Sequence, residues 1–278
     1  MSVSLLSAPV LDREVPVVST PRRSVTWLLA PLEFVAEHSA HLLSKSLGSF
    51  ASGGAHYALP RYLYVGPKGG GEILRVGIFA TLNGDEPEGA LALGHFLQAL
   101  ERQADPAQGF ALFLYPVCNP TGYEDNTPNA RTGRDLNREF WRESTQPEVR
   151  FLESEIWMQG FHGLITLRSA ADSSGIHGFV QGSVLSESLL EPALLAASRY
   201  VPRNRETQIR GLPARDGIIH QGYPGILQAV PGLVRPPFEV TLVSPRRAPV
   251  HRQVEALSAA LASLLTEFRY LQAIAQNI

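Results

Sequence analysis

The sequence predicts an α/β fold built on a largely parallel central sheet. Two observations lead to this prediction: short continuous apolar segments such as residues 110–115 and 164–167, and amphipathic segments of ten or more residues between them. Continuous apolar runs of strand length are typical of strands that are buried on both faces, as in a parallel sheet. The alternation of such strands with helices favours βαβ units.

The first elements follow from their residue patterns in chain order. Residues 61–65 and 74–79 have the composition of strands, and the glycine-rich turn 66–71 between them predicts that they pair as a hairpin. Apolar residues recur at helical spacing over residues 87–103, which predicts an amphipathic helix. The apolar run 110–115 then predicts the next buried strand.

The second half of the chain continues the alternation with a polar loop, a helix, a strand, a helix, a strand and a long terminal helix. The expected ranges are, in that order, 119–142, 147–159, 164–167, 186–200, 238–243 and 250–275. Residues 164–167 have the length and the largely apolar composition of another buried strand. The terminal helix carries its apolar residues on one stripe, which is typical of a helix lying on a sheet.

Composition and charge exclude several classes of protein. With 24 Lys and Arg against 26 Asp and Glu the net charge is −2, which gives no basic surface for a nucleic acid or an anionic membrane. The single cysteine, Cys118, excludes an internal disulfide and favours a reducing, cytoplasmic compartment. Residues 1–25 lack the apolar core of a signal peptide. We expect one domain over residues 1–278, with about the first 60 residues as a helical or extended lead-in.

Three polar segments follow predicted strands, where ligands bind in parallel sheets. Asn83–Gly89 ends one strand and opens a helix, and residues 168–179 follow another. Between them, Asn119-Pro120-Thr121-Gly122 is followed by Gly133-Arg134-Asp135-Leu136-Asn137-Arg138. Taken alone, the first segment is more typical of a turn with acidic residues at a helix N-terminus than of a catalytic motif. A fourth candidate segment follows Leu242.

Together these motifs resemble the zinc carboxypeptidase family, in particular its compact branch near succinylglutamate desuccinylase and aspartoacylase. The family pattern is His-Gly-Asp-Glu, then Asn-Pro-x-Gly and Gly-x-Asp-Leu-Asn-Arg, then a strand ending in His and a strand ending in Glu-Thr-Pro. The order and spacing are met across residues 74–245. The resemblance implies a mixed, largely parallel central sheet with helices on both faces.

At the catalytic positions the sequence departs from the family pattern. The resemblance places the three zinc ligands at Asn83, Glu86 and Arg168, and the general base at Val243. An Asn amide is a poor zinc ligand, an Arg guanidinium has no lone pair to donate, and Val cannot accept a proton. We therefore expect no zinc, no other cofactor and no hydrolytic activity.

Loss of the zinc ion would leave the Glu86 carboxylate buried without a partner, which is costly. We therefore predict that the Arg168 guanidinium pairs with Glu86, with help from Asn83. The alternative is neutral drift, in which Arg168 simply extends into solvent.

The two residues with which the family binds the substrate carboxylate are retained as Asn137 and Arg138. With Arg168 these residues would form a positive pocket, with Arg134 or Arg131 near its rim. Such a pocket suits a small carboxylate, such as a peptide C-terminus or an N-acyl amino acid. Two points stay open: whether Arg131 replaces the family's oxyanion arginine, and whether Arg138 only pairs with neighbouring carboxylates.

Two further accounts of function also stay open. One is an active metal-dependent carboxypeptidase or amidohydrolase, with zinc held by unusual ligands such as Glu86, Asp172 and His177. The other is a structural partner of an active relative. The sequence gives neither the oligomeric state nor the identity of a ligand.

Overall fold

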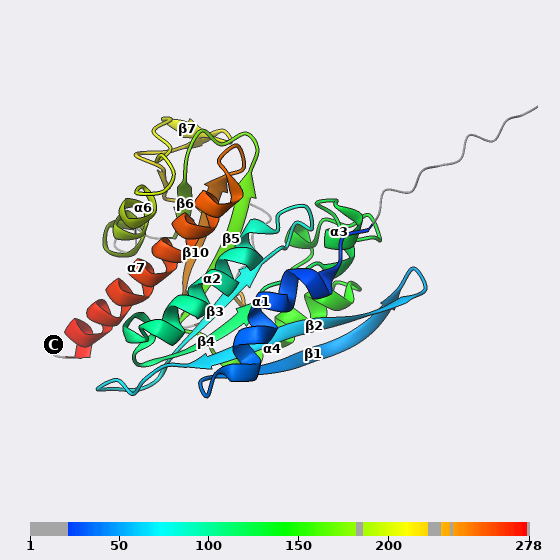
Figure 1. The fold of residues 1–278 in the computed structure, drawn as a ribbon. Coiled ribbons are helices and arrows are strands. Elements are labelled where there is room, and N and C mark those ends of the chain that lie inside the picture. Colours follow the sequence, from blue (N-terminus) through cyan, green and yellow to red (C-terminus); the bar gives the residue numbers. More distant parts are fainter. Residues whose placement is uncertain (1–21, 182–185, 222–228, 234–235, 277–278) are drawn as a thin grey trace, which may run out of the picture.

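One eight-stranded sheet forms the frame of the protein. The structure is a computed structural model and describes residues 22–181, 186–221, 229–233 and 236–276. The strands lie in the order β1-β2-β4-β3-β5-β10-β6-β9 (Figure 1). The expectation that the N-terminus is not a signal peptide concerns residues 1–21, which lie outside the described residues.

The sheet is mixed and largely parallel, as predicted. β4, β3, β5 and β10 lie side by side and run parallel, whereas β2 and β6 run antiparallel to their neighbours β4 and β10. The strands are β1 (Leu42–Ser52), β2 (Ala55–Val65), β3 (Leu74–Ala80), β4 (Phe110–Tyr115), β5 (Gly163–Ala170), β6 (His177–Val180), β9 (Ile218–Ile219) and β10 (Phe238–Pro245); β7 (Gln208–Ile209) and β8 (Leu212–Pro213) form a separate pair.

The predicted hairpin between residues 61–65 and 74–79 is wrong. β2 forms its hairpin with β1, through a turn in which Gly53 and Gly54 have φ angles of 58° and 78°. β4 lies between β2 and β3, because β3 and β4 pair in parallel and are joined by the crossover helix that such pairing requires. The glycine-rich segment 66–71 therefore connects two strands that are not neighbours.

The helices predicted over residues 87–103, 147–159 and 250–275 are present, and two more lie in the lead-in and in the segment predicted as a polar loop. They are α1 (Val25–His38), α2 (Glu88–Arg102), α3 (Pro120–Asp125), α4 (Pro147–Gln159), α6 (Glu191–Ala197) and α7 (Val250–Gln276), with short turns η1 (Asp105–Ala107), η2 (Leu136–Arg138) and the π-helical η3 (Ser186–Leu190). The helix expected over residues 186–200 is thus divided into η3 and α6. Among the described helices, none has both the length and the apolar character that a membrane crossing requires.

Helices cover both faces of the sheet, and each face has its own apolar core. α1, α2, α6 and α7 lie on one face and α4 lies on the other (Figure 1). On the first face, Leu257, Leu261 and Leu264 of the α7 stripe are fully buried. On the second face, Phe79 stacks on Tyr115 with ring centroids 4.6 Å apart. This double layer fixes the edge where the carboxyl ends of the parallel strands meet.

Candidate active site

The loop after β3 is held in place by tight backbone packing. Thr81 has φ = 52°, an uncommon left-handed conformation for a β-branched residue, and its hydroxyl donates to the carbonyl oxygen of Glu86 at 3.3 Å. A Cβ atom at Gly84 would lie 2.0 Å from the carbonyl carbon of Gly122 in α3, so this position requires glycine. These constraints direct the side chains of Asn83 and Glu86 toward the neighbouring strand end.

The Glu86 carboxylate accepts four hydrogen bonds. Arg168 at the end of β5 donates to it twice, from Nε to Oε2 at 2.7 Å and from Nη2 to Oε1 at 3.0 Å. Asn83 Nδ2 donates to Oε1 at 2.7 Å, and the backbone N–H of Ser169 donates to Oε2 at 3.0 Å. The side chains of Arg168 and Glu86 are 10% and 5% exposed, so this is a buried, bidentate ion pair.

The ion pair confirms the predicted contact between Arg168 and Glu86, including the contribution of Asn83. The drift alternative, in which Arg168 reaches solvent, is wrong. Burial by itself would lower the pKa of Arg168, but the attraction of Glu86 outweighs it and the pKa is raised. The guanidinium therefore stays charged and compensates the buried carboxylate.

Asn137 joins the same cluster through its side-chain amide. Its Nδ2 donates to Asn83 Oδ1 at 2.8 Å and to Asp135 Oδ1 at 3.0 Å, and its Oδ1 accepts from Arg168 Nη1 at 3.4 Å. Asn137 is buried in η2. Its amide is therefore engaged in ordering the cluster, which leaves little of it for a ligand.

A second arginine lies beside the ion pair, and the sequence reasoning did not identify it. Arg246 follows β10 and donates from Nη1 to Asp85 at 3.0 Å and from Nε to Ser169 Oγ at 3.3 Å. Its Nη2 lies 3.9 Å from Glu86 Oε1. The available signal was its position, since it lies in the polar segment after Leu242 at the carboxyl end of a parallel strand.

The residues at this place do not fit a catalytic zinc ion. Such an ion needs three protein donors and an open position, but both oxygens of Glu86 are already occupied by Arg168, Asn83 and Ser169. Val243, at the position of the family's base, is aligned with Arg168 in the sheet and offers no proton acceptor. Within the described ranges, no group of three or more His, Cys, Asp and Glu side chains is placed to hold a metal.

The structure does not bring His177 and Asp172 to Glu86. His177 lies across β10 from Arg168, since both are aligned with Val243, and its Nδ1 is 3.1 Å from Ser173 Oγ. Asp172 instead pairs with Arg210 at 3.4 Å. A remodelled site that combines Glu86 with these two residues is thus not assembled in this conformation.

His177 is nevertheless unusual because it is a buried titratable group. Its Nε2 is buried and has no hydrogen-bond partner among the described residues. Burial lowers the pKa of His177 from the usual 6.5 to about 4. The native state therefore keeps this imidazole neutral at pH values at which the unfolded chain already binds a proton.

We expect His177→Gln to flatten the acid dependence of stability. The pKa of His177 is 6.5 in the unfolded chain and about 4 in the native protein, so stability falls as the pH drops from 6.5 to 4 and changes no further below 4. The full loss is about 3 kcal/mol. Urea denaturation of both proteins between pH 4 and 7.5 measures this loss. If the free energy of unfolding fell equally with pH in the variant and in the unmodified protein, His177 would not cause the loss.

The remaining predicted ligand-binding residues are dispersed around the cluster. Arg131 donates to Asp125 at 2.6 Å and also contacts Glu124 and Tyr57 of the β1–β2 hairpin, so its guanidinium is not part of the cluster around Glu86. Arg138, in contrast, has a side chain that is 77% exposed. Its Nε lies 3.4 Å from Asp135.

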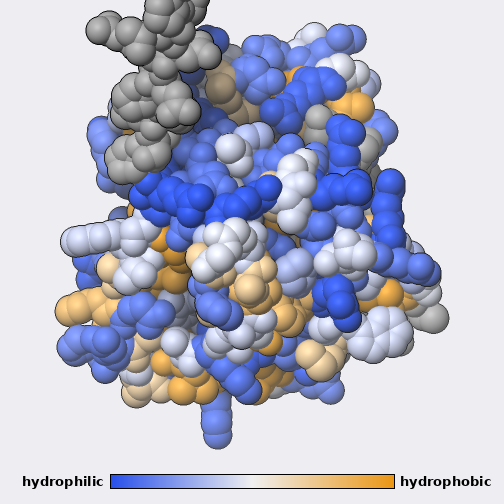
Figure 2. All heavy atoms as spheres, turned by 90° about the vertical axis from the view of Figure 1, so that its right-hand side faces the viewer, coloured by the Kyte–Doolittle hydropathy of each residue, from blue (hydrophilic) through white to orange (hydrophobic). Residues whose placement is uncertain are grey.

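Arg134 is also exposed and is 3.8 Å from Glu139. Figure 2, which views the molecule from the side of α3 and the hairpin tip, shows a surface dominated by hydrophilic side chains with smaller apolar areas among them. A pocket with all the predicted arginines around one point is not present in the described residues. Arg138 and Arg134 remain accessible to a ligand.

Comparison of the structure with known structures identifies its fold. No described protein family and no curated protein sequence matches the chain. Among solved structures, a protein of Shewanella denitrificans that is provisionally assigned to the metallopeptidases has a TM-score of 0.69 at 21% identity, over 86% of this chain and 88% of that one.

Two carboxypeptidases extend this similarity. A metallo-carboxypeptidase of Burkholderia cenocepacia has a TM-score of 0.67 at 17% identity, over 90% of this chain and 70% of the other. Carboxypeptidase A of Helicoverpa armigera has a TM-score of 0.59 at 14% identity, over 92% of this chain and 75% of the other. These identities establish the fold alone. The chain therefore has the fold of the zinc carboxypeptidases.

Proposed function

We propose that this protein is a carboxypeptidase-like binding protein that uses an internal guanidinium in place of zinc and does not hydrolyse peptide or amide bonds. The observation that carries the proposal is the saturation of Glu86 by four donors, two of them from Arg168. Zinc would have to displace this bidentate pair and would gain only one carboxylate ligand. Val243 provides no base to activate water.

We propose further that the ligand carries a carboxylate, such as a peptide C-terminus or an N-acyl amino acid. The support is the retained Asp-Leu-Asn-Arg sequence, in which Asn137 is ordered by the cluster and Arg138 remains 77% exposed. A guanidinium binds a carboxylate in a bidentate manner and with good geometric specificity. Arg138 is thus the residue we assign to ligand binding, with Asn137 holding its loop in position.

Metal content and ligand binding together test this function. We expect protein that has been incubated with Zn²⁺ and dialysed to retain far less than one zinc per chain by elemental analysis. N-acetyl amino acids should raise its melting temperature, since they bind only the native state. The C-terminal amides of these compounds should not raise the melting temperature. The acids should not raise the melting temperature of the Arg138→Gln variant either. Arg134→Gln is the matched control, because Arg134 is similarly exposed.

The outcomes separate the alternatives. Stoichiometric zinc together with hydrolysis of N-acyl amino acids would establish the metal-dependent enzyme instead. If the protein retains no zinc and carboxylates do not raise its melting temperature, the protein is better explained as a structural partner of an active relative. A cytoplasmic location remains a prediction, consistent with a single cysteine, Cys118, that is fully buried.

A further inference from the structure

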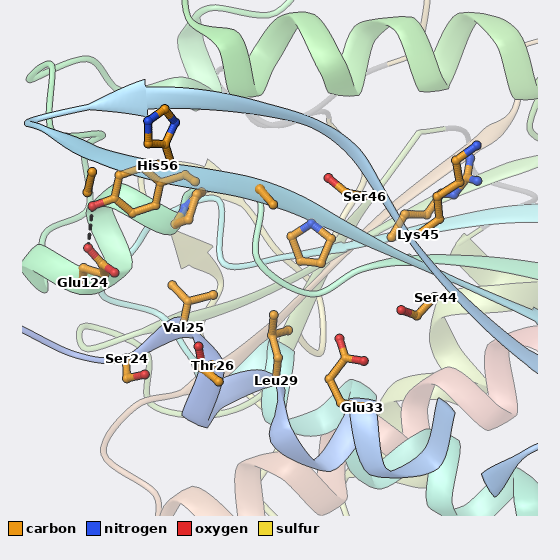
Figure 3. A pocket seen from close by; sticks show the side chains of 16 residues that line it. Ser24, Val25, Thr26, Leu29, Glu33, Ser44, Lys45, Ser46, His56 and Glu124 are labelled. Atoms are coloured by element: carbon orange, nitrogen blue, oxygen red, sulfur yellow. Dashed lines mark hydrogen bonds between the residues drawn. The ribbon is translucent and has the colours of Figure 1, made fainter. Parts of the chain in front are cut away.

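A cavity of about 510 Å³ lies between α1 and the β1–β2 hairpin, and α3 closes one end of it (Figure 3). Its volume is within the range of about 300–1,000 Å³ that is typical of sites for small molecules. It is separate from the cluster around Glu86, since none of the cluster residues lines it. Nothing in the proposed function accounts for this space.

Apolar side chains form part of the cavity wall, beside polar and charged ones. Val25 and Leu29 extend from α1 toward the hairpin (Figure 3), and Ala58 and Pro60 of β2 also line the cavity. Pro120 of α3 adds a further apolar surface at one end. An apolar body of a ligand would therefore replace water along this part of the wall, which is favourable.

Two lysine and arginine side chains of the hairpin, Lys45 and Arg61, line the cavity but point away from α1. Arg61 Nη1 lies 3.1 Å from Glu155 of α4, on the opposite face of the sheet. Lys45 is the cross-strand partner of Arg61, so its side chain emerges on the same opposite face. Figure 3 shows Lys45 and His56 directed away from α1. Lys45 and Arg61 thus belong to the lining of the cavity, but neither forms an ion pair with Glu33.

Glu33 is the uncompensated charge of the cavity. One carboxylate oxygen accepts a hydrogen bond from Tyr62, and no cation among the described residues pairs with the carboxylate. Ser44, the cross-strand partner of Tyr62, lines the cavity with Glu33 and presents its hydroxyl there. In contrast, Glu124 at the other end is neutralised by Arg131 at 3.3 Å. The two ends of the cavity therefore differ in charge.

We propose that this cavity binds a small primary amine with an apolar body. The ammonium group donates to the free oxygen of Glu33 and to the Ser44 hydroxyl, and the apolar body lies against Leu29 and Pro60. A charge-assisted hydrogen bond at Glu33 provides the selectivity, because an anionic or neutral ligand of the same shape lacks it. The cavity thus selects by charge at one end and by shape along its length.

Phenethylamine is a suitable probe, with 3-phenylpropionate and 2-phenylethanol as anionic and neutral ligands of similar shape. We expect calorimetric titration of the full chain to detect binding of the amine, with affinity for the two control ligands lower by about tenfold or more. Amide chemical shifts of Leu29, Glu33 and Ser44 should change in the NMR spectrum when the amine is added.

Glu33→Gln should weaken amine binding by about tenfold, because the amide still accepts from Tyr62 but has no charge. Glu37→Gln, an exposed position one turn later on α1, is the matched control and should leave affinity unchanged. Ser44→Phe should abolish binding by filling the cavity. Equal affinity for all three probes, or unchanged affinity in Glu33→Gln, would overturn the proposal. These results do not depend on zinc content or on Arg138, so the two proposals can fail separately.

Discussion

Replacement of Arg168 with Met is expected to lower the free energy of unfolding by about 3–5 kcal/mol. The substitution preserves much of the apolar stem but removes the guanidinium that donates twice to Glu86. The carboxylate then remains buried, 5% exposed, with only the amide of Asn83 and the N–H of Ser169 as close donors. Urea denaturation at pH 7 measures the loss.

The double variant Glu86→Gln/Arg168→Met should be more stable than Arg168→Met alone, because a neutral amide has no uncompensated charge to bury. Arg138→Met is the matched control. Its guanidinium is 77% exposed and 3.4 Å from Asp135, so we expect a change within about 0.5 kcal/mol. If Arg168→Met costs no more than this control, the ion pair does not stabilise the site.

Local sequence patterns were sufficient to place most elements of the fold. The continuous apolar run 110–115 became β4 and the segment 147–159 became α4 with the predicted bounds. These patterns depend on neighbours along the chain, which a sequence displays directly. The pairing of β2 with β1 and β4 instead depends on contacts between distant segments, and the glycine-rich turn at residues 66–71 gave a misleading local signal.

In the candidate site, too, the sequence predicted some contacts and missed those that depend on the folded arrangement. The contact of Arg168 with Glu86 was predicted because the family resemblance places both residues at zinc-ligand positions and a buried carboxylate needs a compensating charge. Arg246 was missed because its contacts with Asp85 and Ser169 arise only when the ends of β3, β5 and β10 meet. The Glu33 carboxylate, with which no cation among the described residues pairs, has no sequence signature either, since its surroundings come from the hairpin packed against α1.

A zinc site should be recoverable in this fold by two substitutions. Asn83 Nδ2 and Arg168 Nε each lie 2.7 Å from an oxygen of Glu86, so the side chains at positions 83 and 168 converge on this carboxylate. In the double variant Asn83→His/Arg168→His, two imidazoles and one carboxylate would provide the three donors of a catalytic-type zinc site. Removal of Arg168 also eliminates the cation that excludes a metal.

We expect this double variant to retain about one zinc per chain after dialysis, whereas the unmodified protein and the single variant Asn83→His retain little. Zinc at about 1,000 times its dissociation constant should stabilise the double variant by about 4 kcal/mol, which thermal denaturation with and without the metal detects. The additional change Arg246→Ala should strengthen binding, because Arg246 lies 3.9 Å from Glu86. A folded double variant that binds no zinc would show that these side chains do not converge as they do in the structure. Zinc binding by the unmodified protein at the same level would show instead that Arg168 yields its place to the metal, and would overturn the proposed loss of the catalytic ion.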